Sequence, residues 1–136
     1  MRDLAHRYAA LVDGRDFPGV AALFTEDGVL ATARPPKHLS PVAEHVGPAG
    51  VLEAMALLGQ VPRTFHEVVG AAYDGDTGLV ACVAHHVMER DGVPVDLVWH
   101  LRYRDTYRET PDGWRFARRE VHVDLVSERP LSAYRG

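Results

Sequence analysis

Eight histidines occur in this chain of 136 residues, and histidine is the side chain best suited to proton transfer near neutral pH. Histidine can also hold a metal ion, but a metal site needs ligands whose spacing brings them to one point. No His-x-His, Glu-x-x-His or Cys-x-x-Cys spacing occurs where strands would bring such ligands together. We therefore expect no metal, and we expect the chemistry of these histidines to be acid–base chemistry.

The composition excludes several other classes of protein. Cys82 is the single cysteine, so the chain has no internal disulfide, and we predict a small buried apolar residue there. The net charge of −4 gives no sign of nucleic-acid binding. No apolar run approaches the roughly 18 residues of a membrane span, and residues 1–7 lack the apolar core of a signal peptide. A cytoplasmic protein with one domain over residues 1–136 is the expectation.

The first element that could position chemical groups is a helix predicted over residues 2–12. Leu4, Tyr8 and Leu11 recur at helical spacing and form its apolar stripe. Asp13 lies roughly opposite Leu4 on this helix, away from the stripe. It reaches an interior site only if the helix ends there.

The rest of the first half alternates in type. A second short helix is predicted over residues 17–24 with Asp16 as its N-cap, and a third helix over residues 48–59. A short strand is expected over residues 29–33. The proline-containing segment 34–47 is predicted to be a loop or flap.

The second half is rich in β-branched and aromatic residues and in Gly-containing turns. This pattern predicts four long antiparallel strands, over residues 64–73, 79–89, 93–108 and 114–125, with a loose tail after Ser127. Helices followed by such strands indicate an α+β fold, in which helices pack on one face of a bent sheet.

The strand pattern also separates the histidines. His85 and His86 are adjacent, so they face opposite sides of the sheet, one toward the interior and the other toward solvent or a subunit interface. His86 shares its face with Cys82 and Ala84 and is the interior candidate. His100 is expected to face away from the apolar side of its strand. The remaining histidines are interpreted as surface or loop residues: His6, His38, His45 and His122. His38 and His45 could alternatively contact a ligand from the predicted flap.

Several stretches resemble the NTF2-like superfamily, and more closely its SnoaL-like group, which includes scytalone dehydratase and bile-acid dehydratase. The matching stretches are YAALVDGRDF from Tyr8, LFTEDG from Leu23, Thr64–His66, Arg102–Asp105, and Asp112–Phe116 followed by Arg119. The resemblance covers nearly the whole chain. It implies a cone in which N-terminal helices pack on a strongly curved, mostly antiparallel sheet and enclose a small-molecule cavity.

The same resemblance implies a set of site residues. Asp13 and His66 would form an acid–base pair, with Tyr8 as a hydroxyl donor to a carbonyl and His86 as a further ligand of the substrate. The late arginine of the family would be Arg119 or Arg118, and one of these is also expected to form a structural ion pair with Asp105. We expect further substrate contacts from Trp99, Tyr103, Arg119, Phe24 and Met55.

Two other catalytic sets of the superfamily fit less well. The ketosteroid isomerase set matches at Tyr8, but no acidic residue stands in the strand at residues 31–34 or near Trp99, where that set needs aspartates. The Asp-Arg-Asp arrangement of limonene epoxide hydrolase has no convincing counterpart.

Two hypotheses about function remain open. The first is a cofactor-independent lyase or isomerase, of dehydratase or cyclase type, acting on a small apolar carbonyl compound such as a polyketide- or steroid-like metabolite. The second is a non-catalytic module for small-molecule binding or assembly. The first requires the Asp13 carboxylate to lie within about 3.5 Å of a ring nitrogen of His66, or to reach it through one water. A homodimer through the outer sheet face around Val98 and His100 is expected from the family resemblance.

Overall fold

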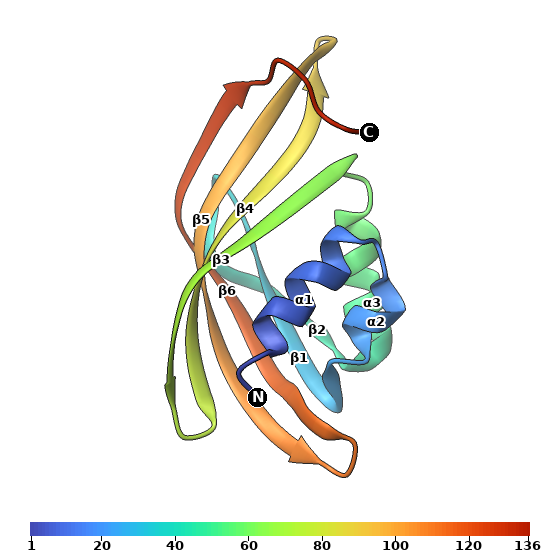
Figure 1. The fold of residues 1–136 in the computed structure, drawn as a ribbon, viewed down its shortest axis with the longest axis vertical. Helices are drawn as coiled ribbons and strands as arrows, with labels where there is room; N and C mark the ends of the chain where they lie inside the picture. Colours follow the sequence, from blue (N-terminus) through green and yellow to red (C-terminus); the bar gives the residue numbers. More distant parts are fainter.

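Three helices cover the concave face of a six-stranded curved sheet in the computed structural model, which describes residues 1–136 (Figure 1). The helices are α1 (Leu4–Asp13), α2 (Phe17–Ala21) and α3 (Gly47–Leu58). The strands are β1 (Phe24–Arg34), β2 (His38–Val46), β3 (Arg63–Asp74), β4 (Thr77–Arg90), β5 (Val93–Thr110) and β6 (Gly113–Pro130). This architecture confirms the α+β cone expected from the sequence.

The strands lie in the order β2-β1-β6-β5-β4-β3. The last four form the predicted antiparallel meander, and the N-terminal strand β1 pairs in parallel with the C-terminal strand β6. Leu30 of β1 lies opposite Arg119 of β6 in this pairing. The first strand of the chain therefore lies beside the last strand, inside the sheet. None of the three helices has the length and apolar character needed to cross a membrane.

The prediction of a loop over residues 34–47 is wrong for most of that segment, because residues 38–46 form strand β2. This strand pairs antiparallel with β1 and has no partner on its other side. An edge strand tolerates proline because half of its amide groups face solvent, so Pro41 fits there. Pro35 and Pro36 lie in the turn between the two strands.

Three other boundaries differ from the predicted ones. Helix α2 ends at Ala21, and Phe24 already belongs to β1, because its backbone pairs with Phe116 of β6. The strand predicted over residues 29–33 is correspondingly longer. The tail after Ser127 was expected to be loose, but β6 continues to Pro130, which pairs with Val95. Partners far away in the chain lengthen both strands, and local sequence does not reveal them.

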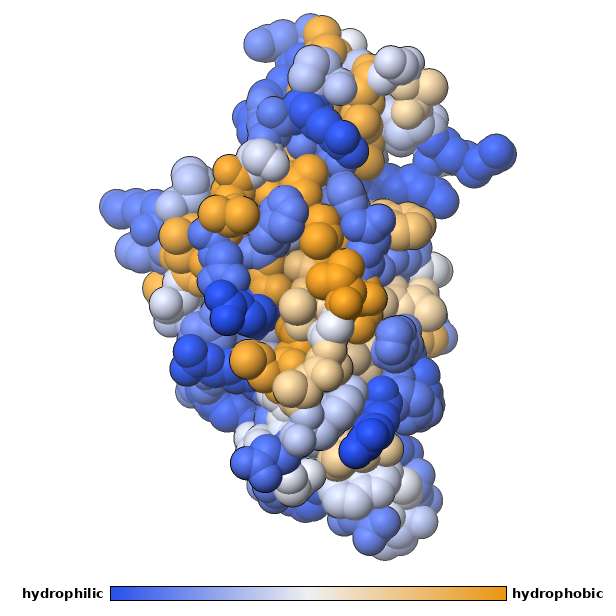
Figure 2. All heavy atoms as spheres, turned by 60° about the vertical axis from the view of Figure 1, so that its left-hand side comes forward, coloured by the Kyte–Doolittle hydropathy of each residue, from blue (hydrophilic) through white to orange (hydrophobic).

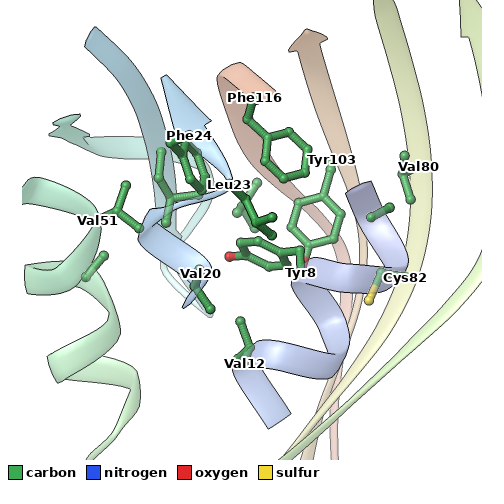
Figure 3. Close-up of a cluster of buried hydrophobic side chains, with 14 of the residues drawn as sticks. Tyr8, Val12, Val20, Leu23, Phe24, Val51, Val80, Cys82, Tyr103 and Phe116 are labelled. Atoms are coloured by element: carbon green, nitrogen blue, oxygen red, sulfur yellow. The ribbon is translucent and has the colours of Figure 1, made fainter. Parts of the chain in front are cut away.

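An aromatic cluster forms the core between α1 and the sheet (Figure 3). The ring of Tyr8 lies with its centroid 5.8 Å from that of Tyr103 and 6.0 Å from that of Phe116, both in edge-to-face geometry. Phe24 packs 5.1 Å from Phe116. Burying each such ring stabilises the fold by about 2 kcal/mol, so this cluster fixes α1 firmly against β5 and β6.

Candidate active site

A cavity of about 320 Å³ lies between the helices and the concave face of the sheet. Most of its twenty lining residues are apolar. The polar side chains among them are Tyr8, Thr32, Arg34, His45, His66, His86, Trp99 and Tyr103. An apolar cavity with a few polar groups is typical of a binding site for a small organic molecule.

Asp13 and His66 meet beside this cavity. Asp13 is the last residue of α1, and its carboxylate reaches the start of β3. Its Oδ1 lies 2.7 Å from Nδ1 of His66 and accepts a hydrogen bond of 3.0 Å from the Thr64 hydroxyl. Its Oδ2 accepts the backbone N–H of His66 at 2.8 Å. The contact required by the first hypothesis is present, while the catalytic role of the pair stays a prediction.

The charge on this pair follows from its surroundings. Burial favours the neutral form of Asp13, but the hydrogen bonds from His66 and Thr64 outweigh burial and hold the pKa of Asp13 below its ordinary 3.8. The ionised carboxylate accepts the Nδ1–H of His66. Nε2 of His66 has no protein partner, and the side chain, only 6% exposed, lines the cavity. Nε2 is thus the nitrogen left for a ligand.

His86 faces the same cavity from β4, with its ring centroid 6.3 Å from that of His66. Its Nδ1 lies 3.0 Å from the carbonyl oxygen of Leu97, to which it donates. Burial lowers the pKa of His86 to about 4, so the ring is neutral at pH 7 and Nε2 is an acceptor. His85 faces outward and contacts Asp96, which identifies His86 as the interior histidine of the pair.

Two tyrosines line the inner end of the cavity. Burial raises the pKa of Tyr8 to about 12, although the nearby Arg119 guanidinium acts in the opposite direction. Burial also raises the pKa of Tyr103 well above 10.0. Both phenols are therefore neutral donors at pH 7. The Tyr8 hydroxyl forms no hydrogen bond within the protein and remains available to a substrate oxygen.

The expected substrate contacts differ in where they lie. Met55, Trp99 and Tyr103 line the cavity as expected, whereas Arg119 and Phe24 do not. Phe24 is part of the core, and Arg119 lies behind the two tyrosines, with its guanidinium 3.5 Å from the ring centroid of Tyr103.

Arg119 is the arginine that pairs with Asp105, at 3.0 Å, and both side chains are fully buried. A buried cation paired with a carboxylate and covered by aromatic rings has a structural role. Arg118 points to the other face of the sheet, where it contacts Glu44 and Glu120. The structural ion pair expected from the sequence is therefore formed by Arg119.

Several lining residues were missed in the sequence. The lining includes Thr32 and Arg34 of β1 and His45 of β2. Arg34 and His45 fall within residues 34–47, where a loop is predicted. For His45 a surface position is the first expectation and a ligand contact the alternative. Its Nε2 lies 3.3 Å from the Thr32 hydroxyl at the cavity wall, which fits the alternative. Thr64 does not line the cavity but donates to Asp13, and it could have been found because it stands two residues before His66 on the same strand face. No group of three or more His, Cys, Asp or Glu side chains is arranged to hold a metal ion.

Residues 1–120 match the SnoaL-like domain, so the chain belongs to the SnoaL-like family. Comparison with curated proteins gives no match. A solved structure described as a scytalone dehydratase from Novosphingobium aromaticivorans is similar, with 20% identity and a TM-score of 0.77 over 97% of this chain and 87% of that chain.

Two further solved structures show the same NTF2-like fold. A hexachlorocyclohexane dehydrochlorinase, LinA type 2, is 15% identical, with a TM-score of 0.77 over 98% of this chain and 87% of that chain. ActVI-ORFA from Streptomyces coelicolor is 21% identical, with a TM-score of 0.67 over 90% of this chain and 94% of that chain. At these identities the likeness concerns the fold.

Proposed function

We propose that this protein is a cofactor-independent lyase or isomerase that moves a proton on a small, largely apolar carbonyl compound, such as a polyketide- or steroid-like metabolite. The observation that carries the proposal is the 2.7 Å contact between Asp13 and His66 at the wall of an apolar cavity. A histidine oriented by a carboxylate, with its other nitrogen unpartnered, is a suitable general base near neutral pH.

The proposed reaction begins with Nε2 of His66 taking a proton from the carbon next to the substrate carbonyl. The carbonyl oxygen gains negative charge as the enolate forms, and the neutral Tyr8 hydroxyl donates a hydrogen bond to it. The Asp13 carboxylate stabilises the imidazolium that forms.

The second step differs between the two reaction types. In a dehydration, the enolate electron pair forms a carbon–carbon double bond and expels the hydroxyl group of the next carbon. That group takes the proton from His66 and leaves as water. In an isomerisation, His66 returns the proton to another carbon. Either way His66 ends neutral, and Nε2 of His86 is placed to accept a hydrogen bond from a substrate hydroxyl.

The similar proteins are consistent with this chemistry. One is described as a dehydratase and another as a dehydrochlorinase, and both names denote eliminations that remove a proton from carbon. Membership of the SnoaL-like family and the mostly apolar lining of the cavity also support a compact organic substrate.

The test uses a panel of cyclic ketones and β-hydroxy ketones incubated with the protein in D2O and followed by NMR. We expect deuterium uptake next to the carbonyl, or loss of water, for at least one compound. His66→Ala and Asp13→Asn should each lower the rate by about 100-fold or more. His6→Ala, which removes an exposed histidine from the start of α1, is the matched control and should keep the full rate.

Turnover that survives both His66→Ala and Asp13→Asn would show that the assignment is wrong. Compounds that bind in the cavity and are neither exchanged nor converted would favour a non-catalytic binding module. Thermal unfolding of each variant checks that the fold is retained.

A further inference from the structure

The cavity is lined by basic side chains and by no carboxylate. They include the guanidinium of Arg34 and the imidazoles of His45, His66 and His86, of which His86 is neutral at pH 7, and no lining residue is Asp or Glu. Asp13, the carboxylate that contacts His66, does not itself line the cavity. A ligand in this space thus meets no negatively charged wall.

Arg34 is the permanent charge in this set. It is the last residue of β1, it is exposed, and its side chain forms no ion pair or hydrogen bond within the protein. Arg118, on the opposite face of the sheet, is in contrast held by Glu44 and Glu120. A guanidinium that borders an apolar cavity without a protein partner has all of its donors free for a ligand.

We infer that the substrate carries a carboxylate on its apolar body and that Arg34 binds this carboxylate at the rim of the cavity. This inference rests on the proposed function in taking the cavity as the substrate site, and it narrows the substrate class to an organic acid.

The chemistry of the rim favours a carboxylate. A guanidinium presents two parallel N–H donors that match the two oxygens of a carboxylate. One guanidinium also balances the single charge of a carboxylate, whereas a phosphate monoester brings a charge nearer −2 at pH 7. The apolar body would then lie inside the cavity, against Met55 and Trp99, which line it.

The test compares two probes with the same ring system and different charge, 2-naphthylacetate and 2-naphthylacetamide, by isothermal titration calorimetry at pH 7 and low salt. The wild-type protein should bind the acid at least about tenfold more tightly than the amide. Arg34→Gln should remove this preference and leave the affinity for the amide unchanged. Arg34→Lys should keep part of it.

The matched control is Lys37→Gln, which removes an exposed cation from the β1–β2 turn that does not line the cavity. This variant should keep the preference for the acid. An equal loss in Lys37→Gln and Arg34→Gln would mean that general charge attraction, and not a contact with Arg34, produces the preference, and it would overturn the inference.

The inference is also overturned if the wild-type protein binds the acid no more tightly than the amide, if it binds neither, or if Arg34→Gln weakens both probes equally. Its failure is distinct from failure of the proposed function, because binding is measured without turnover. A preference for the acid that persists in His66→Ala, while no carbonyl compound is converted by the wild type, would support Arg34 and contradict the proposed reaction.

Discussion

His66 and His86 both donate from Nδ1, but the acceptor is charged for His66 and neutral for His86. This difference separates the roles of the two residues. Nδ1 of His66 faces an ionised carboxylate, which stabilises the ring when it accepts a proton at Nε2. Nδ1 of His86 faces a backbone carbonyl in a more buried place, where a charged ring is disfavoured. We therefore assign proton transfer to His66 and hydrogen-bond acceptance to His86.

The state of His86 gives a pH-dependent prediction. Its ring should remain the neutral Nδ1–H tautomer at pH 7 and titrate near the pKa of about 4. Because this is below the ordinary 6.5, the folded protein binds fewer protons than the unfolded chain between these values. The contribution of His86 to stability is therefore complete above pH 6.5 and is lost as the pH falls toward 4.

Nitrogen-detected NMR of histidine-labelled protein measures this titration directly. A His86→Gln variant assigns the signal, and its unfolding free energy should fall less steeply than that of the wild type over the same pH range. A midpoint near 6.5 for His86 would contradict the burial argument.

The acid–base pair could be identified from the sequence because of the family resemblance, and not from residue patterns alone. Helical periodicity places Asp13 off the apolar stripe, and it approaches β3 only because α1 ends at that residue. Helix ends depend on contacts beyond the local sequence, so periodicity could not decide this point. Strand alternation placed His85 and His86 on opposite faces, and the small apolar neighbours Cys82 and Ala84 favoured His86 as the inward residue without deciding between the two.

At the scale of elements, strand β2 shows where sequence reasoning fails. Prolines and polar residues in the segment 34–47 are ordinary signals of a loop, yet residues 38–46 need only one strand partner at the sheet edge. The four long strands of the meander were predictable because tight turns join consecutive neighbours. The parallel pairing of β1 with β6 has no local signal at all.

The short helix α2 offers a test of capping. The Asp16 side chain accepts the backbone N–H of Gly19 at 2.9 Å, as expected for an N-cap. Asp16→Ala should lower the unfolding free energy by about 1 kcal/mol, measured by urea denaturation at pH 7.

Asp3 provides the matched control, because it occupies the N-cap position of α1 without a capping hydrogen bond. Asp3→Ala should change stability by less than about 0.5 kcal/mol. Equal losses in both variants would mean that the hydrogen bond to Gly19 contributes little.

The whole molecule presents an exposed apolar area on the convex face of the sheet, opposite the helices. Figure 2 shows hydrophobic residues gathered in the middle of this face between charged ones. Exposed apolar side chains on the strands include Phe65, which pairs with the outward-facing His85, and Leu125, which pairs with the exposed His100; they are 60% and 61% exposed. Val98, expected to form this surface, is instead buried within the chain, while His100 is exposed.

We propose that two copies of the chain pair through this face. Light scattering should then give twice the 15.0 kDa mass of the chain. Leu125→Asp should shift the protein to the single-chain mass, because it would bury a charge without a partner. Leu52→Asp, at an exposed position on α3, is the control and should not change the mass. A single-chain mass for the wild type at every concentration would contradict the proposal.

The pairing of β1 with β6 also sets an order of events during synthesis. Phe24 of β1 can pair with Phe116 of β6 only after β6 has been synthesised. A contact between residues so far apart in the chain is slow to form. Asp13 and His66 leave the ribosome long before the strand that closes the cone around them. A nascent chain that stops before β6 therefore carries both members of the pair but lacks Val121, the residue that β6 adds to the cavity lining, and the strand neighbour of β1.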